Sequence, residues 1–251
     1  MCHITVVNGP YVWYLPLFVH QLQKAYPEYE LHILADTEET DILSLKGVRK
    51  FDSPKGEDSG YRAACLRFLH SDETLEGFDY CLITDCDMMI VRESLSIVDQ
   101  HMLDLRKNNL QCYSNYTSMG NKCPGIHFVT KEWWSRTAVA RGKEKDAIDA
   151  TKNVVYDHDE KMLRRLIIDS HLPTPPDKIN PWTYHGEHLG DWRRRVLNKD
   201  KNSNYNMVSA VENMKRVLVF MEKMLWCTCN TRTTTPCSAI TTVIYDKNIT
   251  I

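Results

Sequence analysis

The sequence predicts an α/β fold in which one central sheet has helices on both faces. Short apolar runs that end at turn residues alternate along the chain with longer segments whose apolar residues have helical spacing. The hydrophobic fraction is 43% and the charged fraction 25%, values that are typical of globular proteins. The 251 residues suffice for one α/β domain of about 200 residues with a smaller addition.

The expected elements follow one another in a regular order. The predicted strands cover residues 3–7, 30–35, 48–51, 80–84, 110–114 and 126–130, and residues 88–91 continue the fourth of them. The predicted helices cover residues 15–26, 60–70, 93–107, 131–141 and 159–170. In the first helix Leu15, Phe18, Val19 and Leu22 recur on one face. Ligands of such sheets bind beyond the carboxyl ends of the strands, and we expect the chemistry there.

The character of the sequence changes after residue 180. Residues 181–195 are rich in His, Trp, Gly and Arg, and residues 198–205 are polar. We assign residues 1–205 to the main domain. We interpret residues 206–251 as a helix, or a strand over residues 215–220, followed by a tail rich in Cys and Thr. This end of the chain is similar to the start of a further domain that is not completed.

The composition argues for a cytoplasmic protein without a nucleic-acid partner. A net charge of -2 leaves no basic excess for nucleic acid or an anionic membrane. No apolar run approaches the ~20 residues that span a bilayer. The start of the chain lacks the cationic region of a signal peptide and is interrupted by Pro10 and Pro16. Nine cysteines without a CxxC pair indicate reduced, buried thiols, and nothing indicates an oligomeric state.

The strongest chemical signal is Asp85-Cys86-Asp87, which lies between two apolar runs. Side chains two residues apart in an extended segment share a side, and two carboxylates held close together repel each other. A divalent cation that prefers oxygen ligands would relieve this repulsion. The alternative is a polar turn with solvated acids, but the apolar runs on both sides favour a metal site.

The order of apolar strand, DxD and apolar strand resembles the signature of nucleotide-sugar-dependent glycosyltransferases of the GT-A fold. Further segments that follow the order of that family are residues 6–10, 60–69, 124–129, 157–160 and 185–193. The resemblance spans residues 3–195 and is strongest to the N-terminal glycosyltransferase domain encoded by chlorella viruses, whose enzymes build capsid glycans. It implies a mixed central sheet, a UDP-hexose donor such as UDP-glucose or UDP-rhamnose, and a glycan hydroxyl as acceptor. For a viral enzyme the compartment would be the host cytoplasm.

The same resemblance implies a metal site and a phosphate clamp. Asp85 and Asp87 would bind Mn²⁺ or Mg²⁺, and His188, or alternatively His185, would be the third ligand. An imidazole among the ligands favours Mn²⁺. Arg193 is the first of three successive arginines and stands where the family usually has a lysine that binds phosphate.

The resemblance also implies a nucleotide site and an acceptor site. The residues implied at the nucleotide sugar are Val7, Asn8, Gly9, Tyr11, Arg62, Arg67, Asp85, Cys86 and Arg193. The residues implied at the acceptor are Gly125, His127 and Trp182. Arg62 and Arg67 lie five apart on one predicted helix, so at most one of them is expected to reach the nucleotide. Tyr11 has a ring that can stack on uracil, and His127 has a structural role as its alternative.

Asp157 and Asp159 form a second pair of acids, at the start of a predicted helix. The resemblance makes one of them, first Asp159 and second Asp157, the base that deprotonates the acceptor in an inverting reaction. A retaining enzyme would use the acid only to orient the acceptor. The alternative is that these acids cap the helix, where their negative charge interacts favourably with the positive N-terminal end of the helix dipole.

Three other functions share part of this pattern. Phosphatases of the haloacid dehalogenase type place a DxD after their first strand and a Thr four residues beyond the first Asp. Here at least three predicted strands precede the strand that leads into Asp85, and the position of the Thr is Met89. Sugar-1-phosphate nucleotidyltransferases need a basic, Gly-rich loop after the first strand, which Asn8-Gly9-Pro10 does not provide. The third alternative is a non-catalytic module that binds sugar nucleotides.

Overall fold

The computed structural model describes residues 1–7, 11, 14–35, 47–52, 58–70, 75–115, 126–169, 171–173 and 186–188. The strands are β1 (Cys2–Val7), β2 (Glu30–Ala35), β3 (Val48–Asp52), β4 (Tyr80–Ile83), β5 (Met88–Ile90), β6 (Tyr113–Asn115), β7 (His127–Thr130) and β8 (Gly186–His188). The helices are α1 (Leu15–Ala25), α3 (Ser59–Leu66), α4 (Ile97–Lys107), α5 (Lys131–Ala150) and α6 (His158–Asp169). All of these elements belong to one compact unit, Met1–Asn198. The predicted boundary at residue 205 and the predicted helix and tail over residues 206–251 lie outside the described residues.

Within the described residues, six strands form a mixed sheet in the order β3-β2-β1-β4-β7-β6. The strands β1 to β4 pair in parallel, whereas β7 is antiparallel to both β4 and β6. Parallel neighbours need a crossover connection, and α1 supplies it between β1 and β2. The strands β5 and β8 pair antiparallel in a smaller sheet.

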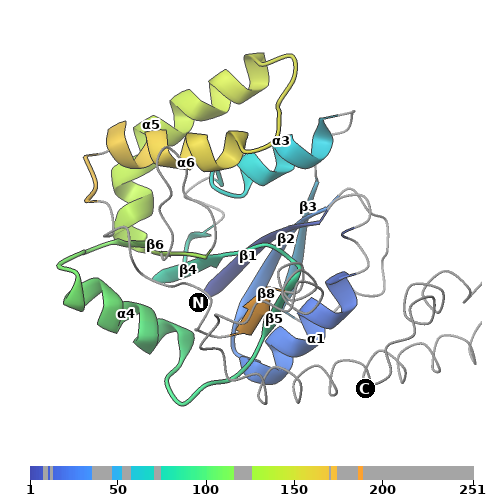
Figure 1. Ribbon diagram of the computed structural model, residues 1–251, viewed down its shortest axis with the longest axis vertical. Helices are drawn as coiled ribbons and strands as arrows, with labels where there is room; N and C mark the ends of the chain where they lie inside the picture. Colours follow the sequence, from blue (N-terminus) through green and yellow to red (C-terminus); the bar gives the residue numbers. More distant parts are fainter. Residues whose placement is uncertain are drawn as a thin grey trace, which may run out of the picture. The chain divides into compact units, whose positions relative to one another are not determined.

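Helices cover both faces of the larger sheet, as Figure 1 shows: α3, α5 and α6 lie on one face and α1 and α4 on the other. Alternate residues of β1 divide between two apolar cores because successive side chains of a strand point to opposite faces. Cys2 and Ile4 join the core beneath α3, α5 and α6, whereas His3 contacts Phe18 of α1 on the opposite face. The predicted class, a mixed α/β sheet flanked by helices, is confirmed.

The helix α5 is longer than predicted, since it continues past residue 141 to Ala150. Arg141, Glu144 and Ile148 are buried at helical spacing in this extension. Two of these three side chains are charged, so the apolar periodicity that predicts a helix fades although the buried face continues. The opposite difference occurs at α3, which ends at Leu66 and not near residue 70.

Candidate active site

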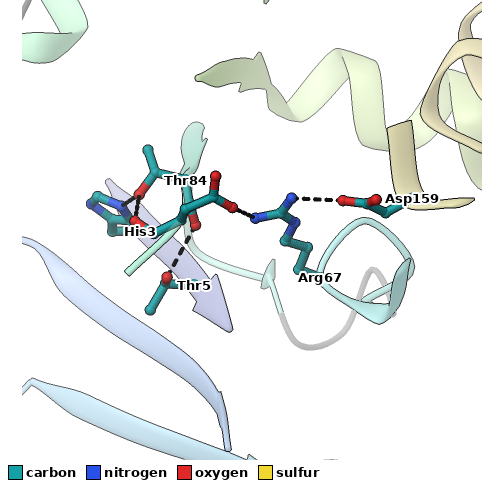
Figure 2. Close-up of polar contacts among 6 residues, drawn as sticks. His3, Thr5, Arg67, Thr84 and Asp159 are labelled. Atoms are coloured by element: carbon teal, nitrogen blue, oxygen red, sulfur yellow. Dashed lines mark hydrogen bonds and ion pairs between the residues drawn. The ribbon is translucent and has the colours of Figure 1, made fainter. Parts of the chain in front are cut away.

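Hydrogen bonds around Thr84 hold the carboxyl end of β4 to β1 (Figure 2). The N–H of Thr84 donates to the carbonyl of Ile4 at 3.1 Å, and the Thr5 hydroxyl donates to the Thr84 carbonyl at 3.0 Å. His3 Nε2 lies 2.8 Å from the Thr84 hydroxyl oxygen. That hydroxyl donates its own proton to the carbonyl of Asp85 at 3.1 Å, so His3 Nε2 must be a donor. These contacts fix the backbone that carries Asp85.

Two buried histidines lie near this strand end. Burial lowers the pKa of His3 to about 3, so the imidazole is neutral at pH 7. Burial likewise lowers the pKa of His127 to about 3, with a further contribution from the charge of Arg67. His127 Nδ1 lies 3.2 Å from the hydroxyl of Tyr113, and the His127 ring meets Phe68 edge-on. These are contacts of a core residue, and a contact between His127 and an acceptor sugar stays a prediction.

The two acids of the DxD differ in exposure. The Asp85 side chain is 47% exposed, whereas Asp87 is only 5% exposed. The chain turns at Cys86 and Asp87 before β5 begins, and it is not extended as the spacing argument assumed. The turn therefore separates an outward carboxylate from an inward one.

Arg67 is the residue that connects the candidate acids. It follows α3 and is buried. Its Nη1 contacts Asp85 Oδ1 at 2.5 Å and its Nη2 contacts Asp159 Oδ2 at 2.8 Å, as Figure 2 shows for the second pair. Burial alone would lower the pKa of Arg67, but the charges of Asp85 and Asp159 outweigh it and raise that pKa above its usual value. A permanent cation therefore holds one acid of the DxD and one acid of α6.

The second pair of acids is divided between two partners. Asp159 is bound to Arg67, whereas Asp157 Oδ1 lies 2.8 Å from Lys161 Nζ, one turn along α6. Asp157 has φ of 66°, in the left-handed region that residues other than glycine rarely adopt. Asp enters this region more often than most other residues, so the φ of Asp157 marks a turn at the start of α6.

Arg62 points to a different part of the molecule. Its Nη1 donates to the carbonyl of Ile148 at 2.5 Å, and its Nη2 donates to the carbonyl of Thr151 at 2.9 Å and to Asp58 Oδ2 at 2.8 Å. These contacts join α3 to the end of α5. A nucleotide contact of Arg62 stays a prediction.

Tyr11 lies beside the acidic turn. The Cys86 thiol donates to the carbonyl of Tyr11 at 3.8 Å. Burial raises the pKa of the Tyr11 hydroxyl, and the charges of Asp87 and Asp85 raise it further. Tyr11 is nevertheless 50% exposed, so its ring is accessible to a ligand that approaches the turn. Val7, the last residue of β1, is buried in the same apolar core as Cys86.

The strand β8 brings the predicted third metal ligand into register with the DxD. Met88 pairs with His188, so the backbone of His188 lies opposite the residue that follows Asp87. The His188 side chain lies outside the described part of the chain, as do the predicted residues Asn8, Gly9, Gly125, Trp182 and Arg193. Among the described residues, no three His, Cys, Asp or Glu side chains are arranged to hold a metal ion. None of the described helices is both long enough and apolar enough to cross a membrane.

Sequence reasoning did not identify the supports of this site. His3, Thr5 and Thr84 lie in strands that the pattern assigned to the core, and polar residues inside such apolar runs were the available signal. Asp58, which anchors Arg62, lies in a polar stretch before α3 with no distinguishing motif.

No family model matches this chain, and no curated protein matches it either. Solved structures do show similarity. An active-site mutant of LgtC is 17% identical, with a TM-score of 0.43, and the match covers 66% of this chain and 70% of that one. The galactosyltransferase LgtC in complex with donor and acceptor sugar analogs is 16% identical, with a TM-score of 0.41 and the same coverage.

The apo form of the glycosyltransferase GlyE from Streptococcus pneumoniae TIGR4 is 14% identical, with a TM-score of 0.44. That match covers 67% of this chain but 43% of GlyE, so this chain spans less than half the length of that protein.

Proposed function

We propose that this protein is a metal-dependent glycosyltransferase that moves a hexose from a UDP-sugar to a hydroxyl of a glycan. The observation that carries the proposal is the bridge from Asp85 through Arg67 to Asp159. It joins three elements at the carboxyl edge of the sheet, where ligands of α/β folds bind. A buried cation that orders two carboxylates, one of them half exposed, is suited to position a polar substrate with many hydroxyls.

The residue types at the DxD fit a divalent cation. Carboxylate oxygens are preferred ligands of Mn²⁺ and Mg²⁺, and imidazole suits Mn²⁺ better than Mg²⁺. Asp87 is a buried acid two residues after Asp85. The pairing of β5 with β8 places the backbone of His188 opposite Met88, which supports His188 as the third ligand. Asp85, Asp87 and His188 would hold the cation, which when bound would neutralise charge on the diphosphate leaving group.

The remaining site residues bind and orient the substrates in this proposal. Arg67 fixes the direction of the Asp85 carboxylate and occupies one oxygen of Asp159. Tyr11 would stack on the uracil ring, and Arg193 would contact the diphosphate. Asp159, or failing it Asp157, either accepts the proton of the acceptor hydroxyl or orients the acceptor. The resemblance of residues 3–195 to the viral glycosyltransferase domain is the basis for the two proposed substrates. The donor would be UDP-glucose or UDP-rhamnose, and the acceptor a viral capsid glycan.

The first test is calorimetric titration of the full chain with UDP, once with Mn²⁺ and once with EDTA. The proposal requires binding at about micromolar Kd with metal and its loss with EDTA. A panel of UDP-hexoses would then identify the donor. Absence of UDP binding under both conditions contradicts the proposal, and phosphatase assays would then examine the haloacid dehalogenase alternative. Metal-dependent binding without transfer or hydrolysis would instead indicate a non-catalytic module.

Asp159→Asn tests the role of the α6 acid. The amide keeps an oxygen that can accept from Arg67 but cannot take a proton at pH 7. If Asp159 is the base, turnover should fall by about a hundredfold or more while UDP binding stays close to that of the parent protein. Loss of UDP binding would show that the residue supports the donor site, and unchanged turnover would exclude it as the base.

A further inference from the structure

The segment that connects α5 to α6 leads directly into the candidate acids. It runs through residues 151–157, between the last residue of α5 and the first of α6. Val154 is buried, whereas Val155 and Tyr156 are exposed, so few apolar contacts hold the segment in place. It ends at Asp157, which has a left-handed backbone.

Two residues at the start of α3 bind this segment through its backbone. Asp58 Oδ2 accepts from the N–H of Val154 at 2.9 Å and from Arg62 Nη2 at 2.8 Å. The same arginine donates to the carbonyls of Ile148 and Thr151. The N–H of Val154 holds the Asp58 carboxylate in its charged form, since this bond and the contact with Arg62 lower the pKa of Asp58.

These contacts extend beyond the capping of a helix. The last carbonyls of α5 have no partner within the helix, and a cation there would be an ordinary cap. The carbonyl of Thr151 belongs to the C-cap residue of α5, but the N–H of Val154 lies three residues further along, and the bond to it holds the connecting segment itself. The side chains of Asp58 and Arg62 are mostly buried, with 18% and 15% of their surface exposed. Water therefore competes weakly with the ion pair between them.

The helix α3 therefore holds the start of α6 at two points. At its beginning, Asp58 and Arg62 bind residues 151–154, and just after its end Arg67 binds Asp159. Asp58 and Arg67 are nine positions apart in the sequence, which corresponds to about 13 Å along a helix. Two anchors at such a distance fix both the position and the direction of the intervening chain, including Asp157.

We propose that Asp58 and Arg62 form a clamp that positions the start of α6, and with it Asp159, for the transfer reaction. This assignment rests on the proposed function. Asp58 and Arg62 act through the segment and are positioning residues, so the clamp should affect the rate of transfer more than the binding of the nucleotide. Its loss should also release residues 151–157 from their native hydrogen bonds.

The test combines hydrogen exchange with kinetics on the full chain. The variants are Arg62→Ala, Arg62→Lys and Asp58→Ala. Glu144→Gln is the matched control, because Glu144 makes a bidentate contact from α5 to Arg165 of α6 without touching the connecting segment. Exchange in residues 151–157 should accelerate about tenfold or more in Arg62→Ala and Asp58→Ala, which remove the contacts, and not in the control.

The kinetic constants separate positioning from a general loss of stability. At a temperature well below unfolding, Arg62→Ala should lower kcat by about tenfold or more with the Kd for UDP changed by less than about threefold. Arg62→Lys keeps the charge but has one donor group in place of a fork, and its kcat should lie between those of the parent and Arg62→Ala. Glu144→Gln should keep the parent kcat.

Three outcomes would overturn the clamp. The first is unchanged exchange in residues 151–157 in both Arg62→Lys and Asp58→Ala, which serve if Arg62→Ala does not fold. The second is a parallel loss of kcat in Glu144→Gln. The third is loss of UDP binding in Arg62→Ala without faster exchange, which would show that Arg62 contacts the nucleotide. Failure of the proposed function is distinguishable, because the parent protein itself would then lack metal-dependent UDP binding while the exchange result would still be informative.

Discussion

Two adjacent residues at the end of β4 are held in different ways. Thr84 is held by neutral hydrogen bonds from His3 and Thr5, both on the neighbouring strand β1. Asp85 is held by Arg67, which also binds Asp159. Arg67 and Asp159 are 92 residues apart in the sequence. The neutral contacts join strands that already pair, whereas the ionic contacts join separate elements. The first network fixes a backbone and the second fixes carboxylates, so different perturbations should disrupt them.

Asp87→Ala should have the largest effect on activity. If Asp87 binds the metal, its loss should lower transfer by about a thousandfold or more and abolish Mn²⁺-dependent UDP binding. Steady-state transfer and calorimetry measure the two effects, and urea unfolding shows whether the fold is retained. Asp149→Ala removes an exposed acid of α5 as control and should change neither quantity. Parent-like turnover in Asp87→Ala would exclude a metal role.

Arg67→Met should have the largest effect on stability. The change leaves Asp159, of which only 15% is exposed, without its cation, and breaking such a buried pair should cost about 3 kcal/mol. Equilibrium unfolding in urea measures it. Arg136→Met is the control, because Arg136 pairs with Glu132 on the surface and should contribute less than about 0.5 kcal/mol. Equal losses in the two variants would show that the bridge does not stabilise the fold.

The two networks also differ in how far the sequence predicts them. The strand β2 begins and ends at the predicted residues, 30 and 35, because its apolar run and its boundaries are local features. The resemblance implies that Arg67 and Asp85 each contact the nucleotide sugar, which stays a prediction, but it does not imply the ion pair that joins the two residues in the structure. The bridge to Asp159 depends on how α3 and α6 pack, and no periodicity within either segment encodes that contact.

The contacts of Arg62 are a second feature that the sequence did not predict. Its position at the start of a helix near the strand ends is compatible with a nucleotide contact, and the sequence does not show that the end of α5 lies within reach of it. The end of α5 was itself misplaced, because the buried Arg141 and Glu144 obscure the apolar face of the helix. The carbonyls that Arg62 binds were therefore not expected in its vicinity.

Acid should disrupt the neutral network. His3, His70 and His127 are buried, and burial lowers their pKa values to about 3, about 4 and about 3. Below the unfolded value of about 6.5 only the unfolded chain takes up these protons, so stability falls as the pH decreases from about 6.5 toward 4. Each histidine should contribute a slope of about 1.4 kcal/mol per pH unit.

Urea unfolding between pH 7 and pH 5 measures this slope. His3→Gln keeps an N–H donor toward Thr84 but does not titrate, so the slope should decrease by the contribution of one histidine. His158→Gln is the control, since His158 lies at the start of α6 and is not fully buried. A slope that His3→Gln leaves unchanged would show that His3 is not the neutral donor of this network.

Thr5→Val should have the smallest effect and tests whether the neutral network supports the ionic one. The change removes one hydroxyl that donates to the Thr84 carbonyl and should cost about 1 kcal/mol of stability. Thr137→Val is the matched control, because the buried Thr137 hydroxyl donates to the carbonyl of Trp133 within α5. If the backbone at Thr84 sets the position of Asp85, Thr5→Val should lower kcat by about two- to fivefold, and Thr137→Val should not. Equal kcat values in the two variants would mean that Arg67 alone positions the acid, and that the strand merely carries it.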